Sequence, residues 1–95
     1  MADVSAQQPG AHELRVSVVS ADQEVWAGTA TMVVARTVEG EIGILPGHQP
    51  ILAILAAGEV RITAAGAPIT AKAEDGFLSV DHDTVTIVAR NAELV

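Results

Sequence analysis

The sequence has 95 residues, of which 49% are hydrophobic but only 2% aromatic, and it contains no cysteine. Its formal net charge is −7, which opposes binding to nucleic-acid phosphates and to anionic lipid headgroups. Without cysteine the chain forms no disulfide and offers no thiolate for catalysis or for a metal site. We therefore expect one compact domain whose core is built from aliphatic side chains.

Residues 1–12 are polar and include a Gln-Gln-Pro-Gly run, so we expect a flexible leader with little apolar surface to bury. They lack the positively charged start and the apolar run of a secretory signal. The longest apolar stretch, Ile51 to Ala57, is far shorter than the roughly 20 residues of a membrane-spanning helix. These observations predict a cytoplasmic protein that does not insert into the membrane, with a folded domain over residues 13–95.

The first half of this domain contains short β-rich segments separated by turn residues. Leu14, Val16 and Val18 alternate with polar residues, which predicts a strand with one buried face. Two further strands are expected on either side of a bend at Gly28, with Trp26 as a large core anchor. The three strands after the first are expected at Glu24–Gly28, Thr31–Arg36 and Ile42–Leu45, the last one ending at a Pro-Gly pair.

The second half continues the same pattern. The segment Ile51–Ala57 resembles a strand buried on both faces, although a short helix is an alternative for so short an apolar run. A polar connection of hairpin length, Asp81-His82-Asp83, separates the last two runs. The other strands are expected at Glu59–Thr63, Ile69–Ala73, Phe77–Val80 and Thr84–Ala89. The prediction is an all-β, antiparallel sandwich or barrel of about eight to ten strands.

Three segments together resemble the N-terminal domain of the ATP synthase epsilon subunit family: Leu14 to Gly28, Gly40 to Leu52 and Gly76 to Val80. The central segment carries the pattern G-E-x-G-x-x-P-G-H-x-P, which is hard to produce by chance. The resemblance implies a flattened β-sandwich that serves as a rotor subunit of the central stalk. Such a subunit couples the gamma subunit to the polar loops of the membrane c-ring during ATP synthesis, at the cytoplasmic face of the membrane, without catalysis or cofactor.

The resemblance also implies two contact sites. The c-ring contact falls on the turn formed by Glu39, Gly40 and Glu41, and the gamma contact falls on His48, Gln49 and Pro50. A carboxylate on a protruding turn can accept charge-assisted hydrogen bonds worth about 1.5–3 kcal/mol. Two prolines, Pro46 and Pro50, would hold the second loop in one shape and so reduce the entropy lost on docking.

The common form of the family continues from about Arg90 into a helical hairpin that inhibits ATP hydrolysis and, in some members, binds ATP. This sequence stops at Val95. Only Asn91 to Val95 could begin such a helix, so we do not expect the inhibitory and nucleotide-binding roles here.

Each candidate site also has an ordinary structural interpretation. The Glu39–Glu41 turn could be a solvated turn, and His48 a surface histidine with no Ser or Cys nucleophile pattern near it. No metal site is expected at Asp81-His82-Asp83, because adjacent side chains of an extended segment point in opposite directions. The glycines of the Gly40–Gly47 segment are followed by no Lys-Ser or Lys-Thr pair, so a phosphate-binding loop is not expected either.

The alternative from another class is a biotinyl or lipoyl carrier domain. These domains are acidic β-sandwiches of similar size, and Lys72 is the single lysine of this sequence. A carrier lysine belongs at the tip of a tight hairpin, whereas Lys72 stands inside an alternating run. We therefore expect Lys72 to point to solvent from within a strand.

Overall fold

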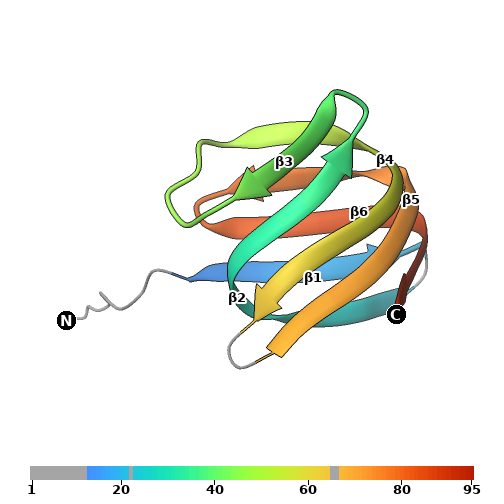
Figure 1. Cartoon of the computed structure of the whole chain (residues 1–95), viewed down its shortest axis with the longest axis horizontal. Coiled ribbons are helices and arrows are strands. Elements are labelled where there is room, and N and C mark those ends of the chain that lie inside the picture. Colours follow the sequence, from blue (N-terminus) through green and yellow to red (C-terminus); the bar gives the residue numbers. More distant parts are fainter. Residues whose placement is uncertain (1–12, 22, 65–66) are drawn as a thin grey trace.

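Six β-strands account for most of the described part of the chain, residues 13–21, 23–64 and 67–95, in a computed structural model (Figure 1). The expected leader, residues 1–12, lies outside the described residues. The described residues contain no helix, which confirms the all-β prediction. The strands are β1 Leu14–Ser20, β2 Gln23–Thr37, β3 Gly40–Ile44, β4 Ile51–Ala64, β5 Ala67–Asp81 and β6 Thr84–Leu94.

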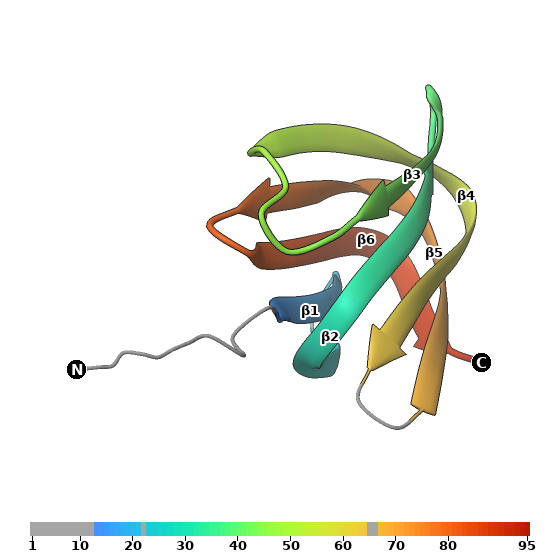
Figure 2. The same cartoon turned by 60° about the vertical axis from the view of Figure 1, so that its left-hand side comes forward.

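The strands form one sheet that curls into a closed, barrel-like sandwich. They are ordered β1-β6-β5-β4-β2-β3, and β1 also pairs with the first half of β2, which closes the sheet on itself. The long strands curve around the interior from one layer into the other (Figure 2). Neighbouring strands are antiparallel except β1 and β6, which are parallel.

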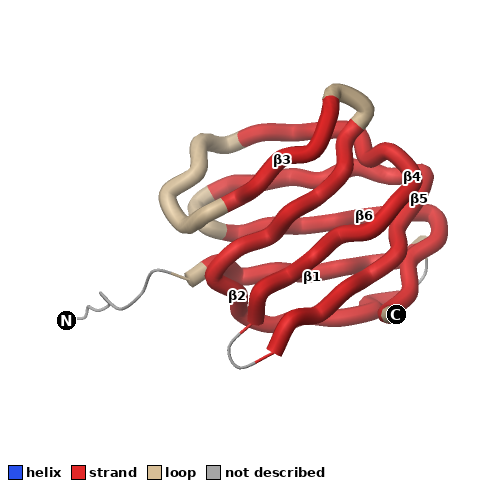
Figure 3. The backbone as a smooth tube through the Cα atoms, viewed as in Figure 1, coloured by secondary structure: helices blue, strands red, loops and turns tan. Residues whose placement is uncertain are grey.

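The described residues form six strands and not eight to ten, because three predicted breaks lie inside continuous strands (Figure 3). β2 runs through Gly28, over which the Trp26 indole lies: a Cβ built at Gly28 would be 2.8 Å from Cζ2 of Trp26. β4 runs through Gly58, and β5 runs through Asp75, whose φ is 61°. A bend lets a long strand change partners without ending it, since β2 pairs first with β1 and then with β3 and β4.

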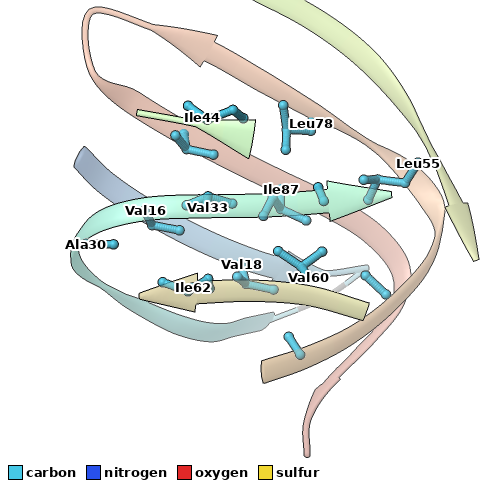
Figure 4. Packing of buried hydrophobic residues seen from close by; sticks show 14 of the residues in the cluster. Val16, Val18, Ala30, Val33, Ile44, Leu55, Val60, Ile62, Leu78 and Ile87 are labelled. Atoms are coloured by element: carbon cyan, nitrogen blue, oxygen red, sulfur yellow. The ribbon is translucent and has the colours of Figure 1, made fainter. Parts of the chain in front are cut away.

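Aliphatic side chains fill the interior (Figure 4). Leu14, Ile44, Ile62, Leu78 and Ile87 are the largest of the fully buried ones. The only tryptophan, expected as the core anchor, is only partly buried and packs against the margin of this cluster. The core therefore rests on β-branched and leucine side chains, as the composition predicts.

One further expectation, that Ile51–Ala57 is buried on both faces, is wrong. The segment Ile51–Ala57 is a strand, but only one of its faces is inward: Leu55 is buried whereas Leu52 and Ile54 are exposed. Residues Asn91 to Leu94 continue β6 and do not begin a helix, because they pair with β5 as far as the Ala71–Leu94 pair.

The predicted hairpin around His82 is confirmed. β5 and β6 are joined by the two residues His82 and Asp83, whose φ angles are 50° and 60°. Two central residues with positive φ are typical of a type I′ turn, whose twist matches that of the flanking strands.

Candidate protein-docking surface

The β2–β3 hairpin carries the first predicted contact, and hydrogen bonds hold its shape. The buried Thr37 hydroxyl donates to the carbonyl oxygen of Gly40 at 2.7 Å and accepts from the backbone N–H of Glu39 at 3.2 Å. The φ of Gly40 is 125°, a conformation that glycine adopts without strain. The backbone N–H of Val38 donates to the carbonyl oxygen of Ile54 at 3.0 Å, which ties the turn to β4.

This hairpin extends from the body of the barrel, with Glu39 and Gly40 exposed at its tip (Figure 1). The side chain of Glu41 is also exposed, but it is engaged: its Oε2 lies 3.1 Å from Nη2 of Arg61 on β4. Both side chains are more than half exposed, so the pair contributes at most about 1 kcal/mol and a partner can displace it. The sequence alone does not connect Arg61 with Glu41, because the two residues meet only across β2.

The loop between β3 and β4 carries the second predicted contact. The backbone N–H of His48 donates to the carbonyl oxygen of Leu45 at 3.1 Å, and Nδ1 of His48 lies 2.7 Å from the carbonyl oxygen of Gln49. The backbone N–H of Gly47 donates to Oδ1 of Asp83 at 2.7 Å, which links this loop to the β5–β6 turn. Gln49 and Pro50 are exposed. The loop therefore has a defined shape and presents polar and apolar groups outward.

The two predicted contacts are not brought together. They lie at opposite ends of β3, whose five residues span roughly 16 Å at 3.3 Å per residue. Separate surfaces of this kind suit two different partners better than one small ligand.

A group of outward apolar side chains beside the second loop was not predicted from the sequence. Leu52 and Ile54 are 73% and 62% exposed, Phe77 is 41% exposed, and Val38 in the hairpin turn is 64% exposed. Ile54 pairs with Phe77 across β4 and β5, and Val38 is hydrogen-bonded to Ile54. We call Val38, Leu52, Ile54 and Phe77 the outer apolar patch.

The outer apolar patch continues across the sheet. Phe77 pairs with Val88 on β6, and Val88 pairs with Val19 on β1; both valines are partly exposed. Single exposed apolar residues are ordinary, but a contiguous group marks an interaction surface. The sequence did hold a signal, since Ile51–Leu55 has large apolar residues at both odd and even positions, more than a one-sided strand needs.

Lys72 has the position expected for a strand residue and not for a carrier lysine. It is exposed between the buried Ala71 and Ala73, inside β5, and its paired neighbours are Glu59 and Glu93. The carrier interpretation is therefore not favoured.

The Asp81-His82-Asp83 segment forms a local contact. Nδ1 of His82 lies 2.8 Å from Oδ1 of Asp81, and both side chains are well exposed. Within the described ranges no group of three or more His, Cys, Asp or Glu residues could hold a metal ion. The same part of the chain has no helix of the length and apolar character that crossing a bilayer requires.

Comparison with known proteins gives a consistent result. The family described as "ATP synthase, Delta/Epsilon chain, beta-sandwich domain" matches residues 13–95. The ATP synthase epsilon chain of Micrococcus luteus is 55% identical over 83 residues, covering 86% of this chain and 91% of the relative. That of Frankia casuarinae is 51% identical, covering 85% and 96%, and that of Streptomyces coelicolor is 48% identical, covering 88% and 68%.

Two solved structures share the fold. A chain of the Euglena gracilis mitochondrial ATP synthase, solved as OSCP/F1/c-ring, superposes with a TM-score of 0.82 at 22% identity. A chain of the Tetrahymena thermophila mitochondrial ATP synthase, solved as central stalk/c-ring, superposes with a TM-score of 0.68 at 16% identity. The alignments cover 99% and 83% of this chain, and they span 61% and 64% of those two chains.

Proposed function

Because the chain belongs to the ATP synthase delta/epsilon chain family, we propose that it is a non-catalytic central-stalk subunit that couples the gamma subunit to the c-ring. The observation that carries the proposal is the family match over residues 13–95, which spans every described strand. Epsilon chains from three bacteria, 48–55% identical, support it. In this role the subunit lies at the cytoplasmic face of the membrane as part of the proton-translocating complex.

The gamma subunit docks on the His48–Pro50 loop and on the outer apolar patch. Pro50 is followed directly by β4, whose residues Leu52 and Ile54 point outward, so loop and patch form one continuous surface. The hydrogen bonds of Gly47 and His48 hold the loop before docking, which reduces the entropy that binding must overcome. Burial of the patch then supplies the hydrophobic part of the affinity.

The c-ring contacts the tip of the β2–β3 hairpin. Glu39 at the tip and Glu41 beside it present carboxylates to cationic groups or backbone N–H groups of the polar loops. Glu41 exchanges its Arg61 partner for the c-ring at little cost, since the Arg61–Glu41 pair is exposed.

Torque passes between these two surfaces through the sandwich itself. β3 joins the hairpin to the His48–Pro50 loop directly, and its Ile44 is packed in the core. A densely packed interior deforms little under load. The subunit therefore makes and breaks no covalent bond, and its contribution is mechanical.

The test is a charge reversal at the hairpin. Glu39→Lys and Glu41→Lys are each built into the complete ATP synthase, and ATP-driven proton pumping is measured in reconstituted vesicles. Glu93→Lys, an exposed glutamate on β6, makes the same charge change away from the hairpin and serves as the matched control.

We expect both hairpin variants to lower pumping per ATP hydrolysed severalfold while the control pumps normally, because a repelled hairpin loosens the link to the c-ring. Thermal melting should show intact folding for all three. Normal pumping by both hairpin variants would count against the c-ring assignment.

A further inference from the structure

β3 has an open edge. In the described residues it pairs with β2 along one side, from the Val33–Ile44 pair to the Thr37–Gly40 pair, and with no strand along the other. An edge of this kind presents backbone N–H and C=O groups that can pair with another chain. Figure 2 shows β3 at the side of the barrel, next to the connection that leads into β4.

The register determines which backbone groups face this edge. Successive residues of a strand direct their N–H and C=O groups to opposite sides. The N–H of Val38 bonds to Ile54 of β4, so the alternate residues Val33, Ala35 and Thr37 direct their backbone groups to β3. Their paired residues are Ile44, Ile42 and Gly40. The N–H and C=O groups of Glu41 and Gly43 are therefore left facing outward.

Gly43 has no role within the described chain that requires glycine. A Cβ built there has nothing within 4 Å, and Gly43 is not among the positive-φ residues. Glycine in the interior of a strand weakens it, and often marks a place where another backbone approaches closely. The space over Gly43 is bordered by Val34, its paired residue on β2, which is partly exposed.

We propose that a partner segment adds to the open edge of β3 as an extra strand, pairing with the backbone groups of Glu41 and Gly43. The partner residue opposite Gly43 is large and apolar and lies across the glycine toward Val34. The residue two positions away lies opposite the Glu41 backbone and leaves the Glu41 carboxylate to the c-ring. Both partner side chains lie on one face because side chains two residues apart point to the same side of a sheet.

The occupant is an extended segment of the gamma subunit, an assignment that rests on the proposed function. The carboxylates of Glu39 and Glu41, at one end of the edge, oppose a second copy of this chain. Two copies would each carry a formal charge of −7, which disfavours their association. At its other end the edge continues to Leu45, which is 56% exposed and adjoins the loop where gamma is proposed to dock.

Amide hydrogen exchange tests the pairing directly. Exchange at single residues is measured by NMR on this chain, free and bound to its gamma subunit. We expect the amides of Glu41 and Gly43 to exchange fast in the free chain and at least a hundredfold more slowly in the complex. The amides of Ile42 and Ile44 are protected by β2 in both states and serve as controls. Unchanged fast exchange at Glu41 and Gly43 in the complex would overturn the proposal.

A matched pair of variants tests it independently. Gly43→Pro removes the outward N–H without removing a bond to β2, and proline is tolerated at such positions of edge strands. Gly43→Ala keeps the N–H while adding a Cβ. We expect Gly43→Pro to bind gamma at least tenfold more weakly than Gly43→Ala by calorimetry, with thermal melting to verify folding. Equal affinities would refute strand addition; if Gly43→Pro does not fold, the exchange result on the unmodified chain decides.

The outcomes separate this proposal from the proposed function. An unmodified chain that does not bind gamma contradicts the proposed function itself. Binding without protection of Glu41 and Gly43 contradicts only the strand addition. Protection that grows with concentration of the isolated chain, without gamma, would overturn gamma as the occupant in favour of a second copy.

Discussion

Two isoleucines on β4 make it possible to measure the contribution of core packing separately from that of partner docking. Ile62 is 1% exposed and lies in the core, whereas Ile54 is 62% exposed in the outer apolar patch. The same substitution, Ile→Ala, at both positions therefore removes the same atoms from two different environments. We predict that Ile62→Ala lowers the free energy of unfolding by about 2–5 kcal/mol, and Ile54→Ala by less than about 1 kcal/mol.

The affinity for gamma should fall when Ile54 is replaced and should stay unchanged when Ile62 is replaced. Complete burial of a side chain such as Leu or Ile is worth about 1.5–3 kcal/mol. Because 62% of Ile54 and 73% of Leu52 is still exposed, docking can gain about 1–2 kcal/mol from each. Alanine keeps the Cβ, so we expect Leu52→Ala with Ile54→Ala to lose about 2 kcal/mol together, roughly a 30-fold increase in Kd.

Urea unfolding and calorimetric titration with the gamma subunit measure the two quantities on the same preparations. Ile62→Ala is the control for a general loss of structure, since it should destabilise the fold while the part that stays folded binds normally. Equal losses of unfolding free energy in Ile54→Ala and Ile62→Ala would refute the assignment of Ile54 to the outer face and of Ile62 to the core. Unchanged Kd in the double variant would refute the outer apolar patch as the gamma surface.

Two further predictions concern the stability of glycine variants and the binding of nucleotide. Gly76→Ala should destabilise the fold by about 3 kcal/mol in urea unfolding, because a Cβ at Gly76 would overlap the Val88 carbonyl oxygen. Gly43→Ala is the control: the space around Gly43 is open, so the free energy of unfolding should change by less than about 1 kcal/mol. Similar losses of stability at the two glycines would contradict this prediction. Calorimetry with Mg-ATP should detect no binding to the isolated chain, because its Gly40–Gly47 segment lacks the Lys-Ser or Lys-Thr of a phosphate-binding loop. A micromolar Kd would show that this reasoning is wrong.

Local alternation was sufficient to predict the class of the fold and several of its parts. Leu14, Val16 and Val18 alternate with polar residues and are all buried, and the polar segment around His82 forms the expected hairpin. The glycine- and proline-rich central segment carried the family resemblance, and residues 13–95 match that family. Such features depend on neighbours along the chain, so a single sequence expresses them.

Strand number was not predictable in the same way. Gly28, Gly58 and Asp75 resemble ends of strands, yet each lies inside a long strand. Whether a bend ends a strand depends on whether a new partner strand continues the pairing beyond it. β2 finds β4 and β3 after Gly28, and these strands lie elsewhere in the sequence.

The all-β class, the aliphatic core and the positions of the two candidate contact loops were thus determined by the amino-acid sequence. Only the tertiary structure decided that Leu52 and Ile54 face outward, that Glu41 meets Arg61, and that Gly43 stands on an open edge. The reason is physical: side-chain alternation is a property of one strand, whereas a face or an edge exists only after several strands have paired.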